Sequence, residues 1–443
     1  MSIVLTMGAC VVAGIVVRAL CRWPRACWLA AFVSVVLIGA LLIFAPAASL
    51  SFFGRALALD VATRAFLLAL FFATSALALL APLASARPHA SPTNALTDAH
   101  GAFFLLAFAP FIAAVTLDSF PLAVFAWAMG LGVLMLSARP QSEGRVGGTA
   151  QFLLLMVLAS ASLLLANRFL EVYPLTPENL DLVRAAAIFL ALGFGVLLAL
   201  APLHFWLGPL ADEWSPLGVA FLVGVAQAVG VWVLWQQMNA ALWLTLRSPL
   251  LSALLVGGGL TALVGALLAL AERRDARALA YLAMVPLGLV GVGMGTGAPL
   301  PLAGALVALV SRAWSVALIA GGMHFARHHP ARHGQLVSAG ALLVGGLALV
   351  GLGPFAGFVA YDAIARAVSA SHPALFVVLV AAHALALVTI VRRAWRIISA
   401  PVESDSRAER VALVAGVGVV IFVSAMLIGA GIFPQMFEAM VKR

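Results

Sequence analysis

Runs of about 20 apolar residues follow one another along the whole length of this chain, which has 443 residues. Each run is long enough to cross a hydrocarbon layer about 30 Å thick as a helix that rises 1.5 Å per residue. The runs are rich in Leu, Ala, Val and Gly and do not alternate with polar residues, so they exclude the strands of a membrane barrel. Because helices satisfy their own backbone hydrogen bonds in lipid, the sequence predicts an all-α transmembrane protein.

The composition agrees with a lipid environment. Hydrophobic residues make up 64% of the chain and charged residues 9%, whereas about 25% of a soluble domain is charged. The net charge of +9 does not indicate a nucleic-acid surface, because the basic residues are scattered among the breaks between apolar runs. We therefore expect lipid, and no nucleic acid, to surround the chain.

Reading the apolar runs between polar breaks predicts about fourteen transmembrane helices. Their approximate spans are 3–20, 27–48, 62–83, 101–117, 120–137, 149–168, 183–203, 215–237, 248–270, 278–296, 300–322, 336–358, 374–391 and 411–433. If loops are numbered by the helix they follow, the odd loops hold 16 of the 25 basic residues, Arg274 among them. The positive-inside rule then places odd loops in the cytoplasm and both termini outside, in a multi-pass protein of the cell inner membrane.

Proline and glycine interrupt two of the predicted helices. The interruption in span seven contains Pro202, Gly208 and Pro209, and the one in span twelve contains Gly353, Pro354 and Gly357. Such residues free backbone carbonyls that need new partners, so both helices are predicted to be discontinuous. The breaks lie an odd number of spans apart, which favours inverted repeats. Paired breaks typically mark an ion or substrate path, although each could instead be a kink that serves packing.

Five segments, in order along the chain, resemble one membrane-protein family. They are 57–60, 118–127, 202–206 (Pro-Leu-His-Phe-Trp), 277–281 (Arg-Ala-Leu-Ala-Tyr) and 353–358 (Gly-Pro-Phe-Ala-Gly-Phe). They are similar to signatures of the antiporter-like, proton-conducting subunits of respiratory complex I, of Mrp antiporters and of membrane-bound hydrogenases. The resemblance covers roughly residues 55–365. It implies an N-terminal three-helix segment (1–100), two inverted five-helix repeats (101–240 and 241–395), and a final loop and helix (396–443).

The chain departs from that family at its titrating positions. Ala128 stands after Trp127 where the family has a glutamate, and Leu197 replaces a lysine before the first break. Arg312 takes the place of the lysine of span eleven, and Tyr361 that of the last Lys or Glu of span twelve. Because arginine effectively never loses its proton, the resemblance implies a degenerate proton relay.

Ionisable residues inside the predicted spans are candidates for a proton path or its gate. His204 could relay a proton or only bind the carbonyls freed by the first break. Arg312 is expected to be a fixed charge, with Asp362, next to Tyr361, as a candidate counter-charge. His383 fits a packing role better than a relay.

A second candidate set lies at the start of span three. Asp60 and Arg64 are four residues apart on one helix face, so they are expected to pair with each other.

No cofactor, metal or catalytic redox site is expected. Cys10, Cys21 and Cys27 lack metal-binding or disulfide spacing, and no phosphate loop, dinucleotide fingerprint or iron–sulfur cysteine set is present. The resemblance implies a membrane-arm subunit of a complex I-like or hydrogenase-like assembly that takes part in proton translocation driven by a partner, among other membrane subunits and a soluble cytoplasmic partner. Two alternatives stay open: a non-conducting scaffold of an ion or inorganic-carbon transport assembly, and an independent secondary transporter.

Overall fold

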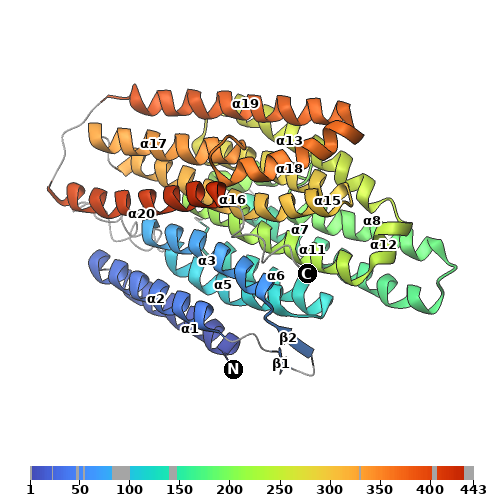
Figure 1. Ribbon diagram of the computed structural model, residues 1–443. Coiled ribbons are helices and arrows are strands. Elements are labelled where there is room, and N and C mark those ends of the chain that lie inside the picture. Colours follow the sequence, from blue (N-terminus) through green and yellow to red (C-terminus); the bar gives the residue numbers. More distant parts are fainter. Residues whose placement is uncertain are drawn as a thin grey trace.

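Helices dominate the structure, as the apolar runs predict. The computed structural model describes residues 2–21, 23–45, 49–52, 55–81, 100–138, 147–328, 331–401 and 407–433. Within these ranges the only sheet is a hairpin of β1 (Ser49–Phe52) and β2 (Arg55–Ala58), antiparallel with Ser49 opposite Ala58. The helices lie roughly side by side, from α1 and α2 at one edge of the molecule to α19 at the other (Figure 1). The predicted all-α transmembrane class is confirmed.

The helices have the following bounds. In the N-terminal part they are α1 (Ser2–Ala19), α2 (Pro24–Phe44), α3 (Val61–Leu80), α5 (His100–Thr116), α6 (Phe120–Met135) and α7 (Gly148–Val172). In the middle part they are η2 (Tyr173–Leu175), α8 (Leu180–Leu197), α9 (Leu207–Glu213), α10 (Pro216–Ala220), η3 (Phe221–Ala226), α11 (Gln227–Ala240) and α12 (Leu242–Arg247). In the C-terminal part they are α13 (Leu250–Ala271), α14 (Asp275–Leu282), α15 (Met284–Gly295), α16 (Pro299–His328), α17 (Arg332–Leu349), α18 (Ala356–Ser371), α19 (Pro373–Ile398) and α20 (Arg407–Ile432).

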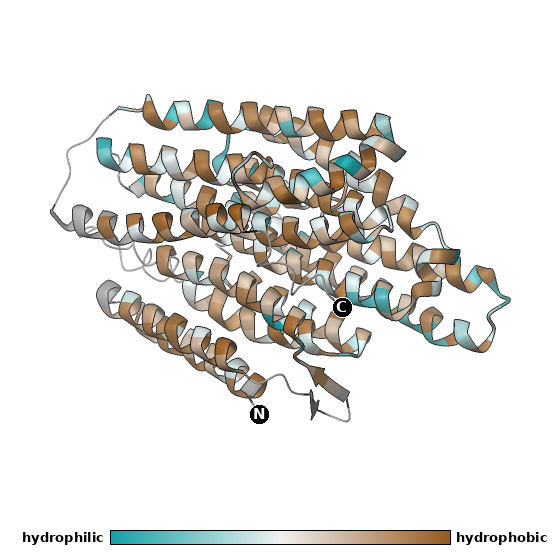
Figure 2. Cartoon of the chain, viewed as in Figure 1, coloured by the Kyte–Doolittle hydropathy of each residue, from teal (hydrophilic) through white to brown (hydrophobic). Residues whose placement is uncertain are grey.

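The described residues contain nine helical segments that are long and apolar enough to cross a membrane, together with four shorter apolar helices. Hydrophobic residues cover these helices along their length, and many of the hydrophilic ones lie at helix ends and connections (Figure 2). Each predicted span overlaps a helix of the structure. The count of fourteen spans and the division into two inverted repeats stay predictions.

The core of the bundle lies around α10–α11 and α14–α16. The span Pro216–Ala240 is wholly buried and Asp275–Gly295 is 94% buried, whereas Ala26–Phe44 at the rim is only 28% buried. In a membrane protein such exposed apolar helices face lipid or neighbouring subunits, because neither demands polar groups. Polar groups of the central helices therefore have to find partners within the bundle.

Two helices are broken where proline and glycine predict it. In span seven the helix stops at the end of α8, with nine residues before α9 begins, and in span twelve six residues separate α17 from α18. Each break contains one X-Pro peptide in the cis form, Ala201-Pro202 and Gly353-Pro354. The two interruptions predicted from the sequence are thus real discontinuities of the backbone.

The two breaks begin with the same backbone motif. After α8, Leu200 N–H donates to Gly195 O at 2.9 Å, and Ala199 N–H donates to Val196 O at 3.1 Å. This is a Schellman motif, whose left-handed position is usually glycine. Here Ala199 occupies it with φ +57°.

The motif recurs residue for residue after α17. Leu352 N–H donates to Leu347 O at 3.0 Å, and Gly351 N–H donates to Ala348 O at 3.3 Å, with Gly351 at φ +72°. In both helices the left-handed residue is the second one after the helix end. The two halves of the chain therefore end their discontinuous helices by the same hydrogen bonds.

Candidate functional site

A buried arginine and a buried glutamine form the centre of the candidate site. Arg312, on α16, is 1% exposed, and Gln227, the first residue of α11, is 2% exposed. The Arg312 Nη2 donates to Gln227 Oε1. We call these two residues the central pair. Gln227 directly follows the π-helical turn η3, a kind of helix irregularity that is frequent at functional sites.

The central pair binds two backbone carbonyls at helix interruptions. Gln227 Nε2 donates to the Leu198 carbonyl, at the end of α8, at 3.0 Å. The Arg312 Nε donates to the Ala283 carbonyl, between α14 and α15, at 2.9 Å. The Leu198 carbonyl lies past the end of α8, where the backbone ladder stops, so it needs a partner in a dry interior. The pair thus joins the first break to a second interruption of the bundle.

Arg312 also lies beside the break of span twelve. A cavity of about 10 Å³ is lined by Arg312, Ser311, Gly351 and Gly357, together with six other residues. The Nη1 of Arg312 and the Oγ of Ser311 are buried and have no hydrogen-bond partner among the described residues. The guanidinium carries five N–H donors in a fixed fork, so it can bind the Gln227 amide and the Ala283 carbonyl at the same time. Arg312 therefore borders the break of span twelve and is linked to the break of span seven through Gln227.

The counter-charge predicted for Arg312 is not Asp362, and that expectation was wrong. Asp362 Oδ1 accepts from the Arg366 Nε at 2.8 Å, one turn further along α18. The two side chains are 35% and 77% exposed, so the pair lies on the surface rather than in the core. Spacing explains the result, because a carboxylate four residues before an arginine pairs within its own helix. Amide and carbonyl oxygens surround the buried cation instead.

Tyr361 and His383 come together, although they were predicted separately. Their ring centroids lie 4.8 Å apart in an edge-to-face arrangement, between α18 and α19. The Nδ1 of His383 lies 2.7 Å from the carbonyl of Leu379, and His383 is buried. The contact holds α19 against the second half of span twelve. A packing role for His383 fits this geometry.

His204 lies in the first break, half-buried, beside Trp206. The Trp206 Nε1 donates to the Val196 carbonyl at 2.8 Å, near the end of α8, and the His204 ring has a backbone hydrogen bond with Pro202 inside the break. No hydrogen bond joins His204 to Arg312 among the described residues. Among the described residues, His204, the central pair and Asp362 thus make no hydrogen bond with one another.

Asp60 and Arg64 were expected to pair with each other, but Arg64 binds a backbone carbonyl instead. Asp60 is the N-cap of α3, and its Oδ1 accepts from Thr63 N–H at 2.7 Å. Arg64 donates from Nη1 to the Ala45 carbonyl at 3.0 Å. Helix capping explains why the expected pair does not form. As the N-cap residue, Asp60 directs its carboxylate to the free N–H groups of the first turn of α3 and not to Arg64.

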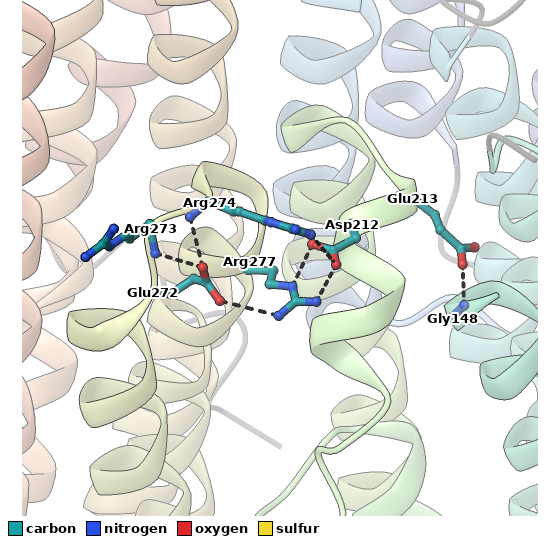
Figure 3. A network of polar contacts seen from close by, with 7 residues as sticks. All are labelled: Gly148, Asp212, Glu213, Glu272, Arg273, Arg274 and Arg277. Atoms are coloured by element: carbon teal, nitrogen blue, oxygen red, sulfur yellow. Dashed lines mark hydrogen bonds and ion pairs between the residues drawn. The ribbon is translucent and has the colours of Figure 1, made fainter. Parts of the chain in front are cut away.

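A charged network joins three odd loops at one end of the bundle (Figure 3). Asp212, at the end of α9, accepts from the Arg277 Nε at 2.6 Å and forms an ion pair with the Arg274 Nη1 at 2.7 Å. Glu272 accepts from the backbone N–H of Arg273 at 2.7 Å and of Arg274 at 2.9 Å. Asp212 and Glu272 lie at loop level, outside the spans.

The carboxylates of this network are held ionised. Burial would raise the pKa of Asp212, but hydrogen bonds from Arg277 and Arg274 outweigh it and lower the pKa below its usual value. Burial would also raise the pKa of Glu272. Hydrogen bonds from the backbone N–H groups of Arg274 and Arg273, together with the charge of Arg277, outweigh burial and lower this pKa. The network is therefore a fixed electrostatic connection between helices that lie far apart in sequence.

Glu213 extends the network to a third loop. Its carboxylate accepts from the backbone N–H groups of Gly148 and Thr149, the second at 2.9 Å, and so caps the N-terminus of α7 (Figure 3). An anion is favourable at a helix N-terminus.

Sequence reasoning missed Glu213, Asp212 and Gln227. For Gln227 the signal was present, because it is the one polar residue between Ser215 and Gln236 in an otherwise apolar span.

Together, the fold and these contacts define a multi-pass helical membrane protein with two discontinuous helices around a buried cation. A family described as NADH:quinone oxidoreductase/Mrp antiporter, transmembrane, matches residues 122–386, which is more than half of the chain. The chain belongs to this family of membrane subunits.

Curated relatives match over parts of their length. NAD(P)H-quinone oxidoreductase subunit 5 of Marchantia polymorpha chloroplasts is 28% identical over 45% of this chain and 31% of the relative. NADH-quinone oxidoreductase subunit N of Desulforudis audaxviator is 33% identical over 34% of this chain and 30% of the relative. Formate hydrogenlyase subunit 3 of Escherichia coli is 30% identical over 39% and 29%. The matched segments thus span less than a third of each of these relatives.

Solved structures share the fold over most of the chain. A chain of respiratory complex I from Thermus thermophilus superposes with a TM-score of 0.74 at 20% identity, covering 97% of both chains. A chain of the Mrp complex from Dietzia sp. gives a TM-score of 0.77 at 16% identity, covering 100% of this chain and 52% of that one. At such identities the likeness establishes the fold.

Proposed function

We propose that this chain is a membrane-arm subunit of a complex I-like or hydrogenase-like assembly. It takes part in proton translocation that is driven by a partner subunit. Family membership and relatives named as quinone oxidoreductase and formate hydrogenlyase subunits support this proposal. So does the likeness of fold to a chain of respiratory complex I over 97% of both chains.

The central pair is the observation that carries the rest of the proposal. A glutamine does not titrate and an arginine keeps its proton, so neither can pass a proton on. Arg312 and Gln227 instead hold the end of α8 and the α14–α15 interruption by hydrogen bonds. With Ala128 and Leu197 at the family's other titrating positions, the relay within this chain is degenerate. The chain therefore acts by positioning its discontinuous helices within the assembly.

The same observation favours a second candidate, a non-conducting scaffold in an ion or inorganic-carbon transport assembly. The partners distinguish the two functions, because a proton-pumping assembly of this kind needs redox centres in another subunit. We expect purification through a tag on this chain to recover membrane subunits and a soluble partner with redox centres. A soluble partner without redox centres would establish the scaffold, and an active chain on its own would establish an independent transporter.

Proton flux through the reconstituted assembly tests the degenerate relay. We expect His204→Ala to lower flux only in proportion to loss of the assembled complex, since His204 lies apart from the central pair. Subunit content and flux should be measured on the same preparation, with Asp362→Asn as a surface control that keeps both. A fully assembled His204→Ala complex without flux would establish a working relay at the histidine and contradict the proposal.

We also propose that the odd loops face the cytoplasm in the cell inner membrane, with both termini outside. The excess of basic residues in odd loops supports this orientation. Arg273 is exposed at the α13–α14 connection, whereas Cys10, Cys21 and Cys27 are buried. An Arg273→Cys variant should react with an impermeant thiol reagent only when the cytoplasmic face is accessible. Reaction from the outer face of intact cells would invert the topology.

A further inference from the structure

A second group of charges on the odd-loop side lines a cavity between the ends of α16, α17 and α19. The cavity has a volume of about 260 Å³, compared with the roughly 10–15 Å³ that one water needs by the same measure. Its polar lining consists of Asp275, Arg327, Gln335, Arg393 and Arg396. This cavity is distinct from the central pair, and the proposed function does not use it.

Among the described residues that line this cavity, positive charge is in excess. The Arg393 Nη1 lies 2.6 Å from Asp275 Oδ1, and the Arg327 Nη2 lies 3.5 Å from Asp275 Oδ2. One carboxylate is thus shared by two arginines. Arg396 is exposed and has no ion pair among the described residues. The lining thus holds three guanidinium groups and one carboxylate. Its net positive charge can be neutralised by an anion of one or two charges.

Buried hydrogen-bonding groups of the lining lack partners. The Arg393 side chain is only 5% exposed, and its Nε has no hydrogen-bond partner among the described residues. The Gln335 amide donates to the carbonyls of Ala400 and Pro401 at 3.1 Å each, but its Oε1 accepts no hydrogen bond there. A ligand that fits must accept from a guanidinium, and a hydroxyl on it could donate to the glutamine.

The surroundings of the cavity place it at the level of lipid head groups. On α19, Val391 and Trp395 are 50% and 69% exposed, and on α17 Leu336 is 49% exposed. These apolar side chains flank the charged lining residues, and tryptophan is enriched where a bilayer meets water. Basic pockets between membrane helices are suited to anionic head groups.

We propose that this cavity binds the phosphate of an anionic phospholipid whose head group carries a hydroxyl, such as a phosphoglycerol lipid. Arg327, Arg393 and Arg396 surround the phosphate, because guanidinium groups bind phosphate oxygens in pairs. The Gln335 Oε1 accepts from the head-group hydroxyl. The acyl chains lie along the exposed apolar faces of α17 and α19.

The test uses the assembly purified from membranes through this chain and stripped of bound lipid. Short-chain phosphatidylglycerol is titrated, with phosphatidylcholine as the neutral lipid and inorganic phosphate as the soluble anion. Bound lipid is counted by native mass spectrometry. We expect saturable binding of phosphatidylglycerol, and roughly tenfold weaker binding in Arg396→Gln and in Arg327→Gln, since each removes one charge-assisted contact. Arg273→Gln, on the same face but away from the cavity, should bind like the native protein.

Three outcomes would overturn the proposal. Equal binding of phosphatidylcholine would show that charge is not recognised. Unchanged affinity in both cavity variants would place the lipid elsewhere. Binding of inorganic phosphate without phosphatidylglycerol would assign the cavity to a soluble anion. Arg396→Gln keeps these outcomes interpretable, because Arg396 is exposed and outside the Asp275 contacts, so its loss does not unfold the helix ends.

Discussion

At the scale of single residues, Gln227 decides how the buried charge is tolerated. It accepts a hydrogen bond from Arg312 and donates one to Leu198, so one amide serves both a cation and a freed carbonyl. A carboxylate at this place would neutralise the charge, and a lysine would repel it. The neutral amide leaves the arginine positively charged and held in one orientation.

Replacing Gln227 by leucine should therefore destabilise the chain. Gln227→Leu leaves the Arg312 Nη2 and the Leu198 carbonyl without partners in a dry interior, at a cost of roughly 3 kcal/mol. We expect a lower melting temperature of the purified assembly and less of this subunit in membranes. Gln237→Leu, on the same helix but only half-buried, is the matched control and should change little. Equal stability of the two variants would refute the role of the central pair.

Several residue contacts lay beyond the reach of sequence reasoning. The family resemblance located Arg312, but the choice between Asp362 and an amide as its partner depends on how helices rotate in the bundle. Apolar runs do not reveal rotation, because lipid-facing and buried sides of such helices are equally hydrophobic. For the same reason Tyr361 and His383 were predicted as separate residues and not as neighbours.

At the scale of helices, the two discontinuous spans share one construction. Proline and glycine in the sequence predicted where each helix stops, since they remove donors or permit unusual backbone angles. The Schellman motifs that end α8 and α17 were not predictable. In the first of them the left-handed residue is Ala199, and an alanine gives no signal for that conformation.

Ala199 and Gly351 occupy matching left-handed positions. We therefore expect glycine at position 199 and alanine at position 351 to change stability in opposite directions. Ala199→Gly should stabilise the chain by about 0.5–1 kcal/mol, because relief of the left-handed strain exceeds the entropic cost of glycine. Gly351→Ala should destabilise it by at least about 1 kcal/mol, since its Cβ would also lie 2.7 Å from that of Tyr361.

Thermal unfolding of the purified assembly measures both exchanges. Gly340→Ala is the control, because Gly340 is helical and nothing lies within 4 Å of the added carbon. This control should be neutral or slightly stabilising. A destabilising Ala199→Gly would mean that the strain at the first break is relieved elsewhere.

At the scale of the whole molecule, the network of Figure 3 holds three odd loops together. Asp212 follows the first break, Arg277 begins the helix pair interrupted at Ala283, and Glu213 caps α7. The network therefore fixes the first turn of α14, whose other end the central pair holds at Ala283, and joins it to α7 and α9. The partners are 64 or 65 positions apart in the sequence, and in one pair the donor is a backbone N–H group, so no sequence signal predicted these contacts.

The pH dependence of stability tests this network. Because the pKa of Asp212 is lowered in the folded protein, its contribution is present above its ordinary value of 3.8 and is lost as pH falls through the lower folded value. Asp212→Asn should thus lower the melting temperature equally at pH 5 and pH 7, and the difference should shrink only below about pH 4. Asp181→Asn, in an exposed pair with Arg184, should have little effect. A difference that disappears between pH 7 and pH 5 would assign the effect to another group.

The buried guanidinium of Arg312 has one more consequence, for the energy stored across the membrane. A permanent positive charge inside the bundle repels any other cation that approaches it, as arginines do in channels that exclude protons. Any water that reaches the interrupted helices therefore meets an electrostatic barrier at this side chain. We therefore expect the chain on its own to let no cation past its two interrupted helices.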